Sequence, residues 1–166
     1  MNEFLCVKEK NMVFSILILT IGIPGSGKTT WVKEYKKQHP YAHVISTDKI
    51  RQELTGHIDC DPNQNEWIHG EAKRRVKQIL DNPNDSIGMG PEIVVDSTNV
   101  DVDEWLAYKK LGASVIIAKL FDVDVDTAMK QQFGRDRIVP RFVLEDKYTT
   151  LQKNKKYMPL IFNMIN

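Results

Sequence analysis

The stretch that decides the fold is Gly22–Thr30, which reads Gly-Ile-Pro-Gly-Ser-Gly-Lys-Thr-Thr. Its two outer glycines are separated by four residues and are followed by Lys28 and Thr29, which is the phosphate-loop pattern. The preceding run, Ile16–Ile21, is almost entirely apolar and is typical of a parallel strand covered on both faces. A strand, a glycine loop and a helix together point backbone N–H groups at one anion. The stretch therefore predicts a site for the phosphates of a nucleoside triphosphate.

Each residue type in this loop has an expected part in binding the triphosphate. Gly25 and Gly27 let the backbone turn and come close to phosphate oxygens. Lys28 is expected to reach the β and γ phosphates of a nucleoside triphosphate, and the Thr29 hydroxyl is expected to hold Mg²⁺. A glycine-rich turn could match by chance, but the strand and the Lys-Thr pair argue against that. The residues expected to bind the cofactor are Gly22, Ile23, Pro24, Gly25, Ser26, Gly27, Lys28, Thr29 and Thr30.

Length and composition indicate one globular domain over residues 1–166, with 42% hydrophobic and 27% charged residues. The net charge of +1 argues against an extended polyanion-binding surface, so any nucleic acid would be held through a local patch. Cys6 and Cys60 match no metal or redox spacing, which favours a reducing, cytoplasmic compartment. The longest apolar run, 12–23, is too short to span a membrane. No membrane and no obligate protein partner are indicated.

Apolar segments alternate with helix-like segments along the chain, which predicts an α/β fold of three layers. We expect a parallel sheet of four to five strands with helices on both faces, after a loose arm over 1–11. The expected strands are 13–21, 41–46, 92–96 and 114–121, with a short edge strand over 160–163. In the helix from Asp61, we expect Trp67, Val76, Ile79 and Leu80 to face inward.

Ligands of such sheets lie beyond the carboxyl ends of the strands, which selects the residues to inspect. Asp48 follows the second strand, and Arg51 lies one turn later on the same helix face. A carboxylate there could act as general base on an acceptor hydroxyl, where positioning matters more than base strength. Asp48 could instead be only a helix N-cap, a role that Asp favours. Thr47 could provide that cap and leave Asp48 free for catalysis.

Other classes of phosphate-loop protein fit less well. A guanine-selective Asn-Lys-x-Asp is absent, since residues 154–157 read Asn-Lys-Lys-Tyr. Asp96 is followed by Ser97, so the paired acids typical of remodelling ATPases are absent. A phosphotransferase needs mobile cations, and residues 130–140 supply Arg135 and Arg137 in a basic loop. Such a loop could close as a lid over the triphosphate, or be a solvated surface loop with ordinary arginines.

These motifs together resemble the kinase domain of the phage-type 5′-hydroxyl polynucleotide kinases. The likeness covers 16 to about 153 and rests on four elements at their mutual spacing. The first is 19–31, which contains the glycine loop. The others are Asp48-Lys49-Ile50-Arg51, Asp96-Ser97-Thr98-Asn99, and Val139-Pro140 after a basic stretch.

The resemblance implies a P-loop kinase fold with a basic lid over 130–140. It also implies ATP-dependent phosphorylation of the 5′-hydroxyl of an RNA or DNA end. By the same resemblance, Lys28 and Thr29 bind the donor, Asp48 acts as general base, and Arg51 contacts the phosphate 3′ of the accepting nucleoside. Asp96, Thr98 and Asn99 would line the acceptor side, with strand-end capping as the alternative. The phage enzyme carries a 3′ phosphatase domain after its kinase, and we expect none here because the chain ends at Asn166.

The lid departs from the family pattern, because 130–137 lacks the Arg-Asn pair near its start. We therefore assign catalytic cations to Arg135 and Arg137 and leave open which phosphate each contacts. A small-molecule kinase and a nucleotide-binding regulatory module remain as alternative functions. The basic run 73–77 could bind nucleic acid, although a solvated helix face is favoured.

Overall fold

The structure is a computed structural model that describes residues 13–57, 61–83, 90–134 and 137–166. The arm expected over 1–11 and the lid residue Arg135 lie outside these described residues. Within the described part, no helix combines the length and the apolar character that a membrane crossing requires.

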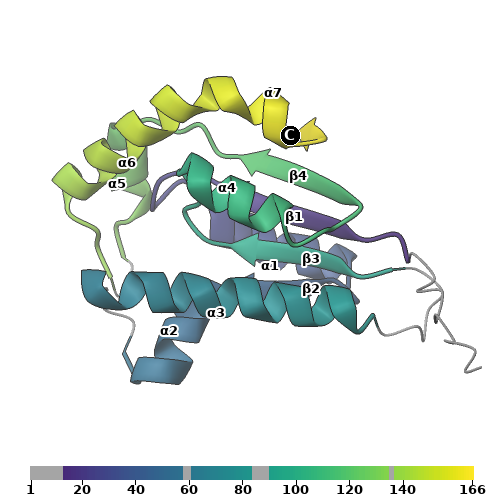
Figure 1. Cartoon of the computed structure of the whole chain (residues 1–166). Helices are drawn as coiled ribbons and strands as arrows, with labels where there is room; N and C mark the ends of the chain where they lie inside the picture. Colours follow the sequence, from purple (N-terminus) through teal and green to yellow (C-terminus); the bar gives the residue numbers. More distant parts are fainter. Residues whose placement is uncertain (1–12, 58–60, 84–89, 135–136) are drawn as a thin grey trace, which may run out of the picture.

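Five parallel strands form one sheet, which confirms the expected α/β architecture (Figure 1). The spatial order is β2-β3-β1-β4-β5, so the strand that leads into the glycine loop lies in the middle. Parallel strands in one sheet bring their carboxyl ends to the same edge. The strands are β1 (Ile16–Ile21), β2 (His43–Ser46), β3 (Glu92–Asp96), β4 (Val115–Leu120) and β5 (Met164–Ile165).

Helices cover both faces of the sheet, as the unbroken apolar sequence of β1 predicts. Alternate residues of β1 enter different clusters: Leu17 and Leu19 pack in the larger one, and Ile18 packs beneath Val32 of the first helix. The helices are α1 (Lys28–Gln38), α2 (Thr47–Thr55), α3 (Pro62–Asp81), α4 (Val102–Lys109), α5 (Val125–Gln131), α6 (Arg141–Asn154) and α7 (Met158–Ile161), with a 3-10 turn η2 (Lys155–Tyr157) between the last two.

The sequence signals act as expected at the start of α3 and at the end of α2, whereas the N-cap of α2 is Ser46 rather than Thr47 or Asp48. The Asp61 side chain accepts a hydrogen bond from the backbone N–H of Asn63 at 2.9 Å, and Pro62 occupies the first turn of α3. Gly56 ends α2 with φ 75°, a left-handed conformation that glycine adopts without strain.

The expected strand over 160–163 is wrong. Pro159 lies in the first turn of α7, so the chain is helical as far as Ile161. The strand comes later, at β5, and the Asn163 side chain accepts a hydrogen bond from the N–H of Ile116 at 2.8 Å just before it.

The inward placement expected for Trp67 is also wrong, because 53% of its surface is exposed. The buried face of α3 is made by Ile68, Ala72 and Val76, which follow one another at the four-residue spacing of a helix face. Trp67 lies roughly on the opposite side of the helix from that face. Helical spacing, rather than hydrophobicity alone, decides which large residue is buried.

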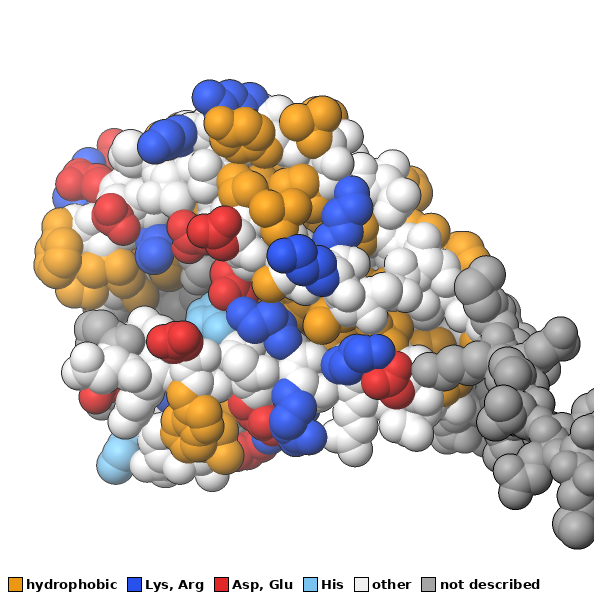
Figure 2. Space-filling model, in the orientation of Figure 1, with side chains coloured by type: hydrophobic (Ala, Val, Ile, Leu, Met, Phe, Trp, Pro, Cys, Tyr) orange, Lys and Arg blue, Asp and Glu red, His pale blue; other side chains and the backbone are white. Residues whose placement is uncertain are grey.

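The basic run on α3 is a solvated face whose cations are paired with carboxylates, and Figure 2 shows red and blue side chains interspersed along this part of the surface. The exposed pairs among them contribute little to stability, whereas Lys73–Glu104 is partly buried, with 25% and 26% of the two side chains exposed. The pairs, by N···O distance, are Lys73–Glu104 at 2.9 Å, Arg74–Glu71 at 2.6 Å, Arg75–Glu53 at 2.7 Å and Lys77–Asp81 at 2.5 Å.

Candidate active site

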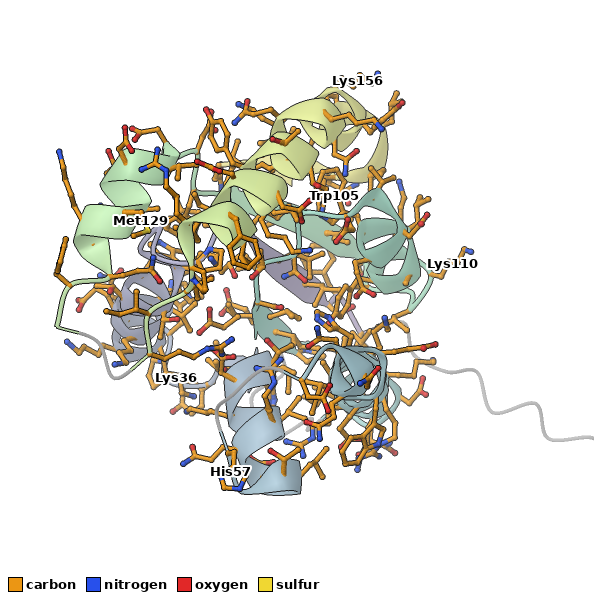
Figure 3. The ribbon with its side chains drawn as sticks, turned by 90° about the vertical axis from the view of Figure 1, so that its left-hand side faces the viewer. Lys36, His57, Trp105, Lys110, Met129 and Lys156 are labelled. Atoms are coloured by element: carbon orange, nitrogen blue, oxygen red, sulfur yellow. The ribbon has the colours of Figure 1, made fainter. Side chains whose placement is uncertain are left out.

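A pocket of about 420 Å³ lies at the carboxyl edge of the sheet. Its walls come from the glycine loop, α2, α3, the segment after β3, α4, the lid and α6. Figure 2 shows a hollow at the left-hand end of the molecule with charged side chains of both signs around it. Figure 3 looks at this end, with His57 marking the α2 side and Met129 the α5 side. A pocket of this size suits a small ligand with a few polar contacts.

The glycine loop presents the start of α1 to the pocket. Gly25 and Gly27 have φ values of 84° and 94°, and Gly27 is the residue that precedes the first turn of α1. That first turn contains no acidic side chain, so its N–H groups and the positive end of the helix dipole favour an anion. The Lys28 ammonium donates to the carbonyl oxygens of Gly22 and Ile23, each at 2.8 Å, and holds a positive charge above the loop.

The loop residues divide into those that line the pocket and those that support it. Pro24, Gly25, Gly27, Lys28 and Thr29 line it. Ile23 and Ser26 are buried beneath the loop, and Thr30 is exposed on α1. A Cβ atom at Gly22 would lie 2.7 Å from the Ser26 hydroxyl oxygen and 2.8 Å from the Phe121 carbonyl oxygen, so this glycine is required for close packing.

Gly25 is packed directly against α5. A Cβ atom there would lie 2.5 Å from the carbonyl oxygen of Ala128 and 3.0 Å from the Gln132 side chain. Gln132 is buried, and its side-chain oxygen accepts a hydrogen bond from the N–H of Val139 at 2.8 Å. The loop, α5 and the end of the lid are therefore in continuous contact.

Thr29 and Asp96 form the part of the site that suits a divalent cation. The Thr29 hydroxyl donates to the Asp96 carboxylate at 3.4 Å, and Asp96 is only 8% exposed at the end of β3. Burial raises the pKa of Asp96 and the negative charge of Asp48 adds to this, whereas the Thr29 hydrogen bond and Lys28 act to lower it. A bound cation would favour the ionised carboxylate.

The donor set fits Mg²⁺, which prefers oxygen ligands and is usually held by one or two protein groups together with phosphate oxygens and water. Among the described residues, no three His, Cys, Asp or Glu side chains gather as a metal-binding group. A cation here would therefore need the oxygens of a nucleotide to complete its coordination.

Asp48 is not the N-cap of α2. The cap is Ser46, whose side chain accepts from the N–H of Lys49 at 3.5 Å. The Thr47 hydroxyl donates to that of Ser97 at 3.1 Å, which fixes the end of β2 to the segment after β3. The Asp48 side chain is 65% exposed and lines the pocket, so its carboxylate is available to a ligand.

Arg51 joins Asp48 at the pocket wall. Its Nη1 atom lies 2.6 Å from the Asp48 carboxylate, and its Nη2 atom donates to the Asn65 side-chain oxygen at 3.3 Å. Only 5% of the Arg51 side chain is exposed. From the lid, Nη1 of Arg137 lies 3.9 Å from the same carboxylate and also lines the pocket. Two cations from different elements thus converge on one acid.

The segment after β3 contributes to the site and to the fold. Asn99 has φ 45°, and its side chain donates to the Thr20 carbonyl oxygen at 2.9 Å. The backbone carbonyl oxygen of Asn99 accepts a hydrogen bond from the indole N–H of Trp105 at 2.6 Å. Thr98 and Asn99 both line the pocket. Asn99 therefore fixes the turn after β3 while it faces the pocket.

The sequence reasoning missed a group of pocket residues on helices α3, α4 and α6. Asn65 and His69 lie one turn apart on α3, and this i, i+4 spacing was the available signal. Glu104 of α4 faces them, with Nδ1 of His69 at 3.5 Å from its carboxylate. The other missed side chains that line this region are Val100, Asp101, Val143 and Lys147.

The fold resembles that of several solved kinases. A chain of the Pnkp1/Rnl/Hen1 RNA repair complex superposes with a TM-score of 0.71 at 22% identity, over 90% of this chain and 48% of that one. Shikimate kinase from Acinetobacter baumannii has a TM-score of 0.57 at 11% identity, over 93% and 83% of the two chains. A gluconokinase from Sinorhizobium meliloti 1021 has 0.56 at 15%, over 87% and 78%. These likenesses show the P-loop kinase fold.

Two sequence comparisons add the family. An adenylate kinase from Sulfurovum sp. (strain NBC37-1) is 26% identical over 133 residues, which are 75% of this chain. The chain spans 65% of that relative's length. A family model described as an AAA domain matches residues 17–152, which include the glycine loop, Asp48, Asp96 and the lid. The chain belongs to this AAA domain family and has the P-loop kinase fold.

Proposed function

We propose that this protein transfers the γ-phosphoryl group of ATP to the 5′-hydroxyl of a nucleic-acid end. The observation that carries the proposal is the Asp48–Arg51 pair, which stands in the same pocket as Lys28 and the start of α1. A carboxylate for the hydroxyl and a buried guanidinium for a neighbouring phosphate match an acceptor that carries its own phosphate.

The donor half of the pocket has the groups that a triphosphate needs. Lys28 and the first turn of α1 would bind the β and γ phosphates. Thr29 and Asp96 would hold Mg²⁺, which neutralises charge on the phosphate oxygens and orients them for in-line attack. This reassigns Asp96 from the acceptor side to the metal, because its carboxylate lies beside the Thr29 hydroxyl.

In the acceptor half, Asp48 would receive the proton of the 5′-hydroxyl. The oxygen of that hydroxyl forms a bond to the γ phosphorus as the bond from this phosphorus to the bridging oxygen breaks, and ADP leaves. Arg51 would bind the phosphate 3′ of the accepting nucleoside and align the sugar. The short distance between the two side chains would place hydroxyl and phosphate in a fixed relation.

Arg137 is the described lid cation in a position to act. Its contact with Asp48 at 3.9 Å is long and partly exposed, so it can be exchanged for a phosphate oxygen. A guanidinium beside the transferred group would stabilise charge in the transition state. We propose the same role for Arg135, by sequence alone, because it lies outside the described residues.

A second candidate is phosphorylation of a small polyhydroxyl acceptor. The pocket volume of about 420 Å³ favours it, since a compact ligand would fill the space that remains beside the nucleotide. Two structural neighbours, a gluconokinase and a shikimate kinase, are enzymes of this kind, although at their low identity they share only the fold with this chain.

A transfer assay separates the candidates. The full chain is incubated with γ-labelled ATP and Mg²⁺ and with a 5′-hydroxyl oligonucleotide, a nucleoside 3′-monophosphate or a free nucleoside. Our proposal expects label on the first two acceptors and none after chelation of Mg²⁺. Label on the free nucleoside at an equal rate would favour the small-molecule kinase. Hydrolysis of ATP without any transfer would contradict both and favour a regulatory module.

A further inference from the structure

Unpartnered polar atoms gather at the pocket. Among the described residues, two buried side-chain atoms that belong to pocket-lining residues have no hydrogen-bond partner, namely Nε of Arg51 and Oδ1 of Asn99. The buried Nδ1 of His69, in the same pocket, has only a long contact of 3.5 Å with the Glu104 carboxylate. Buried polar groups are nearly always well hydrogen-bonded, so this group of atoms calls for an explanation.

Arg51 is continuous with a row of polar side chains that leads away from the proposed reaction centre. Arg51 contacts Asp48 on one side and Asn65 on the other, at 2.6 Å and 3.3 Å. His69 follows Asn65 by one turn of α3 and lies 3.5 Å from Glu104. We call Asn65, His69 and Glu104 the acceptor wall. Its first residue, Asn65, contacts Arg51, which is the proposed binding group for the 3′ phosphate of the accepting nucleoside.

Glu104 is the fixed hydrogen-bond acceptor of this wall. Lys73, which is not among the residues that line the pocket, donates to both oxygens of the carboxylate at 2.9 Å and 3.1 Å. His69 foremost, and Lys73 as well, lower the pKa of Glu104 to about 2 against the effect of burial. The carboxylate is thus ionised at neutral pH and can only accept hydrogen bonds. Oε1 accepts from Lys73 alone, whereas Oε2 accepts from Lys73 and also has the long contact with Nδ1 of His69.

The surroundings of Glu104 suit a flat, uncharged group better than a second phosphate. Asp101 lines the pocket together with Glu104. These carboxylates already have the cations Lys147 at 4.0 Å and Lys73 at 2.9 Å as partners, so a phosphate would compete with them for the same lysines. Val100 and Val143 line the same pocket and offer apolar contact to the face of a ring. A nucleobase has both an apolar face and N–H donors on its edge.

We propose that the acceptor wall binds the base of the accepting nucleoside, with Glu104 as the residue that selects it. This rests on the proposed function, in which Asp48 and Arg51 hold the sugar and its phosphate. Guanine fits best, because two adjacent N–H donors on its edge match the two oxygens of one carboxylate, and one of these donors would replace the long contact of His69 with Oε2. Bases with a single donor group facing the wall make one such bond, and His69 can meet an acceptor beside it.

The test compares four 5′-hydroxyl oligonucleotides that differ only in the first base, with labelled ATP and the full chain. The other bases cannot form the pair of hydrogen bonds that guanine forms with Glu104. We therefore expect kcat/KM for the guanine end to exceed that of each other end by about tenfold. Glu104→Gln should remove this preference by raising KM for the guanine end, while KM for ATP stays unchanged. Glu53→Gln is the matched control: Glu53 is also an ion-paired carboxylate, it is not among the residues that line the pocket, and its variant should keep the preference.

Each outcome decides the matter. Equal rates for all four ends with the unaltered protein would overturn the base-binding wall and leave the kinase proposal standing. Transfer to none of them would overturn the proposed function and the wall with it. A guanine preference that survives in Glu104→Gln would overturn the role of Glu104. The comparison of ends in the unaltered protein needs no variant, so a folding defect in Glu104→Gln cannot obscure it.

Discussion

The outer face and the pocket face of α3 differ in how well their polar side chains are hydrogen-bonded. On the outer face, Glu71 is bound by both Arg74 and Arg75 at distances of 2.6–2.8 Å. On the pocket face, the buried Nδ1 of His69 has only a contact of 3.5 Å with the Glu104 carboxylate, which is long for a hydrogen bond. Satisfied charges keep a helix soluble, whereas unsatisfied buried groups mark where a ligand is expected.

The comparison also separates two kinds of arginine. Arg74 has 62% of its side chain exposed, and its pairing lies along a single helix. Arg51 has 5% exposed and connects α2 with α3 while one of its nitrogens stays unpartnered among the described residues. Net charge and composition cannot distinguish these two residues. Only their places relative to the pocket do so.

Lys28→Ala is expected to have the largest effect on the rate of transfer. The ammonium of Lys28 is the cation placed above the glycine loop, and loss of one such charge typically costs about 100- to 1,000-fold in rate. Transfer from labelled ATP should fall by that amount. Arg74→Ala, the matched removal of a cation on the outer face of α3, should leave transfer within about twofold of the unaltered rate. Equal loss in both variants would remove the distinction between cations of the pocket and cations of the outer surface.

Asp48→Ala is expected to have the next largest effect on transfer. Loss of a general base lowers the rate by about 100-fold or more, yet ATP binding should stay nearly unchanged because Asp48 acts on the acceptor. Single-turnover transfer and ATP binding by equilibrium titration measure the two quantities separately. A variant that keeps the full rate would show that the assignment of the base is wrong.

Arg51→Ala should act on the acceptor rather than on the nucleotide. A charge-assisted hydrogen bond to a phosphate contributes about 1.5–3 kcal/mol, which corresponds to roughly a tenfold or greater rise in acceptor KM. KM for ATP should change by less than about twofold. The reverse pattern, with ATP weakened more than the acceptor, would contradict the role of Arg51.

Glu104 differs from the outer carboxylates such as Glu71 because it lines the pocket and is also paired with Lys73 of α3. Its pKa is lowered from 4.5 to about 2, so its stabilising effect is present above pH 4.5 and is lost as the pH falls toward 2. With allowance for solvent screening, Glu104→Gln should lower the free energy of unfolding at pH 7 by about 1–2 kcal/mol. Urea unfolding at pH 7, 4.5 and 3 should show this difference shrinking at the lowest pH. A constant difference would contradict the shifted pKa.

Much of the fold follows from local signals. The glycine loop, the apolar β1 and the caps at Asp61 and Gly56 depend on residues that are close in sequence, so short-range rules locate them. The contact of Thr29 with Asp96 depends on β3 lying beside β1, and strand order is not written in any one segment. Sequence therefore placed Asp96 near the site without indicating its neighbour.

The acceptor wall was harder to predict for a similar reason. Asn65 and His69 become site residues only because α3 packs so that one edge of its buried face meets α4. Trp67, two residues away from each, turns to solvent by helical geometry and not by its chemistry. The roles of Asp48, Arg51 and the lid cations stay predictions that the assays above address.

The close packing of Gly25 on Ala128 has a mechanical consequence. Because no room separates the glycine loop from α5, and Gln132 continues that contact to Val139, the loop cannot shift without carrying the root of the lid with it. A single methyl group added at Gly25 would push the glycine loop and α5 apart, because its carbon would lie 2.5 Å from the Ala128 carbonyl oxygen. A ligand that moves the glycine loop would therefore also move Val139 at the end of the lid, because Gly25 and the buried Gln132 connect the two.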